Sequence, residues 1–226
     1  MNTELVIFDM AGTTVNDEDG VNRCVRDTLR QVGVAVSREA VNTVMGIPKP
    51  DALRYLIEQS GRRELLGERI EAIHADFVAR MIRFYQSDPS VYEIPGTSDT
   101  FRRLRASNIK VALDTGFSRD IVDVVLARLG WSVSNQLDAT VASDEVARGR
   151  PYPDMIQKVM GDLGVREAHC VAKVGDTPSD LQEGINAGCG LVVGVTGGSH
   201  SAGQLRLCDH THLIGTVAEL PALLGL

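Results

Sequence analysis

Carboxylates stand at the ends of three separate apolar stretches of this chain. They are Asp9, Asp114 and Asp176, with Asp180 four residues beyond the last. If the stretches are parallel strands of one sheet, their carboxyl ends meet at the same edge and can share a site. Asp176 and Asp180 are ligands of the kind that Mg²⁺ prefers, and Asp9 with water would complete an octahedral set. A carboxylate beside such a cation can attack phosphorus, because the cation offsets the repulsion between two anions.

The stretch Leu5–Thr14, LVIFDMAGTT, is the most informative part of this pattern. Its apolar run suits a strand that is buried on both faces of a parallel sheet, with Asp9 at the carboxyl end of the strand. The turn of small residues that follows offers backbone N–H groups and hydroxyls, among them that of Thr13, to an anion. The stretch therefore predicts a carboxylate beside a phosphate-binding turn.

Strands and helices are expected to alternate along most of the chain. Apolar runs predict further strands at 109–113, 139–142, 170–174 and 191–195. Helical periodicity or helix start signals predict helices at 97–107, 119–129, 153–163 and 178–187. This alternation is typical of right-handed crossovers, so we expect an α/β fold with a doubly wound, Rossmann-like parallel sheet.

A helical unit interrupts the alternation between residues 17 and 90. Helices are predicted over about 21–33, 38–45, 50–61 and 67–85. Pro50 suits the first position of the third of these helices, and YEIPG at 92–96 marks the return to the sheet. We therefore expect residues 1–16 and 91–226 to form a catalytic core and residues 17–90 to form an inserted all-helical cap.

The composition is that of an ordinary soluble globular protein. The 226 residues are 43% hydrophobic and 23% charged, and the net charge of −7 with no long basic run argues against nucleic acid as a partner. No apolar stretch approaches the length of a membrane span, and no secretory leader is evident. The four cysteines are widely spaced, so reduced thiols and a cytoplasmic location are expected.

The motifs, in their order, resemble those of the haloacid dehalogenase superfamily over about residues 3–225. That superfamily opens with a strand ending in Asp-x-Asp-x-Thr, whose first Asp is a nucleophile and whose second is a general acid/base. Here the second position is Ala11, and the form Asp-x-Ala-Gly-Thr is similar to the phosphonatase branch, the phosphonoacetaldehyde hydrolases. The stretches VGDTPSD at 174–180 and GRPYP at 149–153 are similar to the later motifs of that branch.

The resemblance implies a role for each matching residue. Asp9 would be the nucleophile, and the Mg²⁺ ligands would be Asp9, the backbone carbonyl of Ala11, Asp176 and Asp180. Contacts to the phosphoryl group or the rest of the substrate are expected from Thr13, Met45, Thr115, Gly116 and Arg150. The guanidinium of Arg150 suits a phosphoryl group because its planar fork donates two parallel hydrogen bonds, and Arg148 is a nearby alternative.

Ala11 bears on the type of reaction. A phosphate ester hydrolase uses a second Asp to protonate the leaving alkoxide, so a chain with alanine there favours a leaving group that needs no proton on oxygen. An enamine leaving from carbon is such a group, and Lys49, which follows Met45-Gly46 in the cap, is the expected amine. At a helix N-terminus the macrodipole disfavours its ammonium form, which favours Schiff-base formation with an aldehyde.

Three positions depart from the phosphonatase pattern. Ala52 replaces a histidine, Asp19 a cysteine, and Phe117 an aromatic hydroxyl. These are positions of the substrate pocket, so a substituted 2-oxoalkylphosphonate fits the pattern as well as phosphonoacetaldehyde does.

Three functions are compatible with the sequence. The first is Mg²⁺-dependent hydrolysis of a carbon–phosphorus bond through a Lys49 Schiff base and a phosphorylated Asp9. The second is a phosphate monoester phosphatase or phosphomutase of the same superfamily, which Ala11 disfavours. The third is a binding or regulatory protein that keeps the fold. By resemblance alone, a homodimer formed through the caps is expected.

Overall fold

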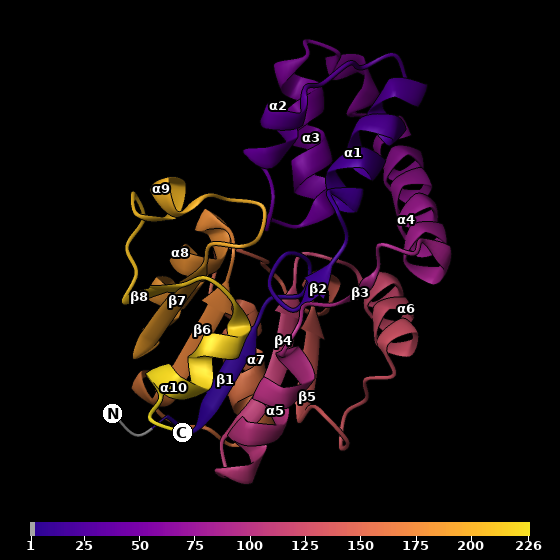
Figure 1. The fold of residues 1–226 in the computed structure, drawn as a ribbon. Coiled ribbons are helices and arrows are strands. Elements are labelled where there is room, and N and C mark those ends of the chain that lie inside the picture. Colours follow the sequence, from indigo (N-terminus) through magenta and orange to yellow (C-terminus); the bar gives the residue numbers. More distant parts are fainter. Residues whose placement is uncertain (1–2) are drawn as a thin grey trace.

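A six-stranded parallel sheet forms the lower half of the molecule in the computed structural model, which describes residues 3–226 (Figure 1). The strand order is β5-β4-β1-β6-β7-β8. The strands are β1 (Leu5–Phe8), β4 (Lys110–Thr115), β5 (Ala139–Ala142), β6 (Val171–Gly175), β7 (Leu191–Val195) and β8 (His212–Ile214). The predicted α/β class is confirmed. From β1 the chain continues to β4 and β5 at one edge of the sheet, and then returns to β6, β7 and β8 toward the other edge. The strand order therefore reverses direction between β1 and β6, and sheets of this type bind ligands at such a switch point.

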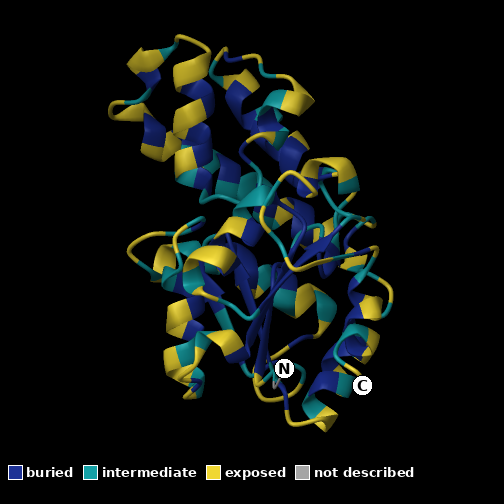
Figure 2. Cartoon of the chain, turned by 90° about the vertical axis from the view of Figure 1, so that its left-hand side faces the viewer, coloured by how far each residue is buried: buried dark blue, intermediate teal, exposed yellow. Residues whose placement is uncertain are grey.

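Helices cover both faces of the sheet. One face packs on α5 (Thr97–Ala106), α6 (Arg119–Leu129) and α10 (Leu220–Leu223). The other packs on α7 (Asp154–Leu163) and α8 (Pro178–Ala187). Figure 2 shows the buried strands between helices whose outer faces are exposed. Burial on both faces explains why the strands are runs of apolar residues rather than alternating ones.

Four helices stand above the sheet, between β2 (Val15–Asn16) and β3 (Tyr92–Glu93) in the sequence, where the cap was predicted (Figure 1). They are α1 (Gly20–Gln31), α2 (Arg38–Asn42), α3 (Lys49–Gln59) and α4 (Arg69–Ser87). The expectation that Pro50 is the first residue of its helix is wrong by one position. The amide of Ala52 bonds to the carbonyl of Pro48, so Pro48 is the N-cap and Lys49 is the first helical residue.

Two short strands join the helices to the sheet. β2 (Val15–Asn16) and β3 (Tyr92–Glu93) pair antiparallel where the chain leaves the sheet and where it returns. The sequence did not predict this ribbon, nor β8 and the four-residue helix α9 (Ala202–Leu205), because such short elements show no measurable periodicity. Single turns of 3₁₀ helix complete the fold at Arg63–Leu65, Ser143–Glu145, Ala168–Cys170 and Val217–Glu219.

Candidate active site

Three predicted metal ligands meet at the carboxyl edge of the sheet. β1 and β6 are paired so that Phe8 lies opposite Val174, and the amide of Asp9 donates to the carbonyl of Val174 at 2.9 Å. Asp9 and Asp176 therefore leave adjacent strands side by side. One carboxylate oxygen from each of Asp9, Asp176 and Asp180 lies within 4.8 Å of the others, and all three residues are buried.

The start of α8 holds Asp180 in this position. The hydroxyl of Thr177 accepts from the amide of Asp180, and Asp180 Oδ2 accepts from the amide of Thr177 at 3.1 Å. This reciprocal capping box satisfies two helix N-terminal amides and fixes the orientation of the Asp180 carboxylate, whose Oδ1 lies 2.8 Å from Arg150 Nη1.

Two side chains orient Asp176. Thr13 donates its hydroxyl to Asp176 Oδ1 at 3.0 Å. Ser199, in the loop after β7, donates its amide to Oδ2 at 2.6 Å and its hydroxyl to the same oxygen. The predicted contact of Thr13 with a phosphoryl group stays a prediction; its side chain is fully buried, and its hydroxyl donates to Asp176.

The electrostatics of this group fit a hard divalent cation. Burial, with the charge of Asp180 next in size, raises the pKa of Asp9 to about 7. Burial and Asp180 likewise raise the pKa of Asp176 to about 6. Asp180 Oδ1 makes no well-aligned hydrogen bond, although Arg150 Nη1 lies 2.8 Å from it. A bound cation would relieve the repulsion among the three carboxylates, so the donor set suits Mg²⁺.

A second acidic group, formed by Asp114, Asp180 and Glu183, lies beside the first. Two protein cations occupy it. Lys173 Nζ lies 3.0 Å from Glu183 Oε2, and Arg150 Nε lies 2.9 Å from the same oxygen. Both cations also pair with Asp114, and they hold its pKa below the usual value although burial opposes this. This second group is therefore a buried ion-pair network.

Arg150 connects the two groups. Its Nη1 donates to Asp9 Oδ1 at 2.6 Å and lies 2.8 Å from Asp180 Oδ1. Its Nη2 donates to the carbonyl and the carboxylate of Asp114. The guanidinium thus meets the expected nucleophile directly. The alternative cation, Arg148, is 59% exposed and pairs with Asp154.

Lys173 and Glu183 are functional candidates that the sequence analysis missed. Both are fully buried. Two signals could have found them: Lys173 interrupts an otherwise apolar strand, and Glu183 follows Asp180 by three residues and so lies on the same face of α8.

Four backbone N–H groups of the turn after Asp9 make hydrogen bonds within the turn itself. The amides of Thr13, Thr14 and Val15 all donate to the carbonyl of Met10, and the amide of Gly12 donates to Val15. Three of these four N–H groups converge on one carbonyl because successive tight turns end there, so none of the four is free to bind an anion. The hydroxyl of Thr14 also donates to the backbone carbonyls of Asp9 and Met10.

The helices α1–α4 are called the cap below, and the sheet with its flanking helices is called the core. The loop before α3 packs the cap against the core. A Cβ added to Gly116 would lie 2.7 Å from the carbonyl oxygen of Ile47, and one added to Gly149 would collide with Pro48. Gly46, at a φ of +87°, packs in the same way against Thr177. Glycines on both sides of the joint thus allow the two backbones to approach closely.

Lys49 lies at this joint and is only 4% exposed. Its Nζ donates to the carbonyl of Ile47 at 3.1 Å and lies 5.5 Å from the centroid of the Phe117 ring. Burial lowers the pKa of Lys49 to about 8, against the opposing effect of the Asp9 charge. A larger share of this amine is therefore neutral near pH 8 than for an ordinary lysine.

A small cavity of about 20 Å³ separates the cap from the core at this point. Its lining includes Asp9, Ala11, Met45, Lys49, Thr115, Gly116 and Arg150. Of the predicted site residues outside the metal group, only Thr13 is absent from this lining. A cavity of this size holds about one water molecule, so little free space remains between the two parts of the chain at this point.

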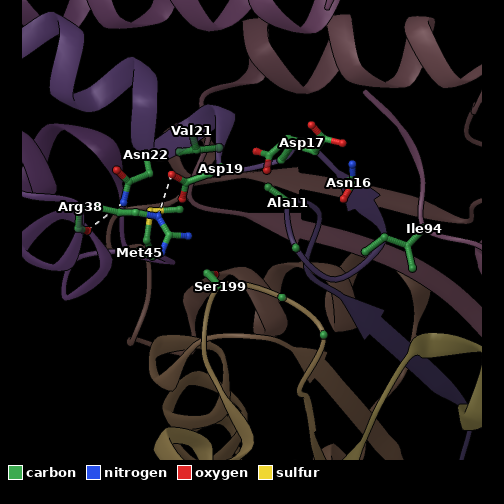
Figure 3. Close-up of a pocket in the computed structure, with 14 residues that line it drawn as sticks. Ala11, Asn16, Asp17, Asp19, Val21, Asn22, Arg38, Met45, Ile94 and Ser199 are labelled. Carbon is green, nitrogen blue, oxygen red and sulfur yellow. Dashed lines mark hydrogen bonds and ion pairs between the residues drawn. The ribbon is translucent and has the colours of Figure 1, made fainter. Parts of the chain in front are cut away.

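A larger pocket of about 280 Å³ adjoins the cavity and shares Ala11, Val21, Met45 and Ser199 with it. Figure 3 shows Asn22, Asp19 and Arg38 of the cap on one side and Ser199 of the core on the other. Arg38 Nε donates to Asp19 at 2.9 Å.

The three departures from the phosphonatase pattern occupy different surroundings. Asp19 lines the larger pocket, Phe117 lines the small cavity, and Ala52 is buried in the helical core of the cap.

Among residues 3–226, no helix is both long and apolar enough to cross a membrane.

The chain belongs to the haloacid dehalogenase-like hydrolases, whose family model matches residues 6–194. It is 34% identical over 213 residues to a phosphonoacetaldehyde hydrolase from Bacillus cereus, with 90% of this chain and 79% of that protein covered. It is 30% identical over 207 residues to a bifunctional phosphonoacetaldehyde hydrolase/aminoethylphosphonate transaminase from Clostridioides difficile (strain 630). That match takes in 86% of this chain but only 32% of the longer protein.

A solved structure has the same fold. A phosphonoacetaldehyde hydrolase-like protein from Oleispira antarctica matches with a TM-score of 0.83, covering 100% of this chain and 92% of that one. The two sequences are 23% identical, so this likeness bears on the fold alone. The superfamily identified from the sequence motifs is thus confirmed, and the chain is a hydrolase of this family.

Proposed function

We propose that this hydrolase cleaves the carbon–phosphorus bond of phosphonoacetaldehyde or a related 2-oxoalkylphosphonate. The observation that carries the proposal is that Lys49 of the cap and Asp9 of the core line one buried cavity. Ala11 lines the same cavity, so no carboxylic acid stands at that position to protonate an alkoxide. The identity to phosphonoacetaldehyde hydrolases supports the same reaction.

Lys49 begins the reaction. Its neutral amine adds to the aldehyde carbon, and loss of water with uptake of one proton from solvent leaves a protonated imine. A carboxylate oxygen of Asp9 then attacks phosphorus, and the electron pair of the carbon–phosphorus bond moves into the imine to form an enamine. Protonation and hydrolysis of the enamine release the aldehyde and restore Lys49. Water hydrolyses the aspartyl phosphate, releasing phosphate and restoring Asp9.

Other residues position these groups. Arg150 holds Asp9 through the 2.6 Å contact and fixes the direction of the attacking carboxylate. Asp9, Asp176, Asp180 and the carbonyl of Ala11 would hold Mg²⁺. When bound, the ion would supply positive charge that offsets the repulsion between the carboxylate and the phosphonyl oxygens.

Substrate entry requires the cap to move. The cavity of about 20 Å³ is too small for the skeleton of two carbons and one phosphorus in phosphonoacetaldehyde, and the adjoining pocket of about 280 Å³ opens at the cap–core boundary. The β2–β3 ribbon contains both segments that connect the cap to the core, so it is the expected hinge. Closure then buries Lys49 and excludes bulk water from the imine.

Borohydride trapping tests the proposal. Wild-type protein incubated with phosphonoacetaldehyde and borohydride should carry a reduced adduct on Lys49, located by peptide mass spectrometry. The Lys49→Met variant should show no adduct and should lose phosphate release by at least about 10³-fold. Lys158→Met is the matched control, because Lys158 is a partly exposed lysine paired with Asp162 on α7.

Two results would contradict the proposal. The first is the absence of an adduct on Lys49 under conditions in which phosphate is released. The second is efficient hydrolysis of sugar phosphates that survives Lys49→Met, which would favour a phosphatase or phosphomutase. Unchanged behaviour of Asp9→Asn in every assay would favour a binding protein that keeps the fold.

A further inference from the structure

A buried lysine that the reaction above does not use lies beneath the site. Lys173 is the third residue of β6, opposite Ile7 of β1, and is fully buried. Gly184 of α8 leaves space for its stem, since a Cβ there would lie 2.9 Å from Lys173 Cβ. A charge in such a position is strongly unfavourable unless it is paired, so its partners indicate what it does.

Every carboxylate that Lys173 contacts is also a partner of Arg150. Lys173 Nζ pairs with Asp114, lies 3.0 Å from Glu183 Oε2 and lies 3.4 Å from Asp180 Oδ1. Arg150 pairs with the same three residues. The two cations therefore share three buried carboxyl groups, and Arg150 additionally contacts Asp9.

This sharing determines the direction of the guanidinium. Glu183 holds Nε and Asp114 holds Nη2, and because the group is planar these two contacts direct Nη1 at Asp9. Without Lys173, Asp114 and Glu183 would have only Arg150 as a counter-charge. The guanidinium would then be drawn toward them and away from Asp9.

We propose that Lys173 is a positioning residue that keeps Asp114 and Glu183 in the arrangement that aims Arg150 at Asp9. The inference rests on the proposed role of Asp9 as the nucleophile. It assigns Lys173 no contact with the substrate, because Lys173 is covered by the sheet and α8 and does not line the cavity.

The Lys173→Met variant tests this, because methionine has a similar length and no charge. Its crystal structure should show Arg150 Nη1 beyond about 3.5 Å from Asp9, outside hydrogen-bond distance. With phosphonoacetaldehyde, kcat should fall by about 10²-fold while KM changes less than about threefold, as expected when a catalytic group is displaced by about 1 Å. Met155→Ala is the control, since Met155 is a fully buried core residue on the same face of the sheet.

The double variant Lys173→Met/Glu183→Leu separates positioning from stability. An apolar replacement of a buried ion pair is often tolerated by the fold, so this protein should fold while kcat stays about 10²-fold low. Wild-type kcat in either folded variant, or Arg150 still bonded to Asp9, would overturn the proposal. Failure of both variants to fold would assign the pair to stability alone and would also overturn it.

The crystallographic measurement does not depend on the substrate. If wild-type protein fails to cleave phosphonoacetaldehyde, the proposed function falls, whereas the Arg150–Asp9 distance in Lys173→Met still decides the role of Lys173.

Discussion

The core and the cap contribute to the site in different ways. In the core, Arg150 alone contacts four carboxylates, and Asp176 accepts hydrogen bonds from two separate segments of the chain. In the cap, Lys49 donates one hydrogen bond, to the carbonyl of Ile47 two residues before it. The core groups are thus held by many tertiary partners, and the cap group is held by its own loop.

In the proposed mechanism this difference matches two roles. The groups proposed to act on phosphorus are held by strand ends and ion pairs of the core. Lys49, whose amine is proposed to form and release an imine, is carried on a loop that packs against glycines. Changes to the core should therefore affect chemistry at a constant substrate affinity, whereas changes to the joint should affect closure.

The largest effect is expected from Asp9→Asn. Asparagine keeps the shape but is a poor nucleophile, so phosphate release should fall by at least about 10⁴-fold. Borohydride should still trap the imine on Lys49, because that step precedes transfer to Asp9. A phosphate-release assay beside the trapping assay measures both. Loss of trapping together with phosphate release would mean that the two halves of the site do not act independently.

The pH dependence of imine formation should be the next largest effect. The neutral amine is the nucleophile, and its pKa is lowered to about 8, so the trapping rate should rise with pH and level off above that value. At pH 6 it should be about 100-fold below the plateau. Asp9→Asn should move the midpoint to lower pH, because the charge of Asp9 raises the pKa of Lys49. A midpoint near 10.5 would contradict the buried environment of the amine.

A smaller effect is expected at the joint. In Gly116→Ala the new Cβ would lie 2.7 Å from the carbonyl oxygen of Ile47, so the cap cannot close fully. We expect kcat/KM to fall by about tenfold, as closure becomes less favourable by about 1.4 kcal/mol. Gly161→Ala is the control, because a Cβ there meets nothing within 4 Å. Equal activity of the two variants would show that the contact does not limit closure.

The smallest effect concerns stability. The pKa values of Asp9 and Asp176 are raised to about 7 and 6, so the folded protein binds more protons than the unfolded chain between about pH 4 and 7. Their contribution to the stability of the metal-free protein should therefore fall as the pH rises through this window. Mg²⁺ should raise the melting temperature by about 5 °C at pH 8 and by less at pH 5.5. Asp176→Asn should reduce the Mg²⁺ effect, and a larger Mg²⁺ effect at pH 5.5 than at pH 8 would contradict the assignment.

Local patterns were sufficient for the main elements of the fold. The predicted bounds of α6, β5, α8 and β7 agree with the structure residue for residue, because capping residues, prolines and apolar runs mark both ends. The β2–β3 ribbon and β8 could not be predicted in this way. They exist through pairing with strands that are distant in sequence, and two or three residues have no period of their own.

The site residues were likewise predictable from local sequence, whereas their contacts were not. Residue types and spacing within the chain were enough to nominate Asp9, Asp176, Asp180, Lys49 and Arg150, because each stands in a short motif at a strand end or a helix start. Only the tertiary structure showed that Thr13 donates to Asp176, that Arg150 contacts Asp9, and that Lys173 and Arg150 both pair with Glu183. A side chain's partners come from other strands and helices, so they depend on sheet register and packing, which local sequence does not encode.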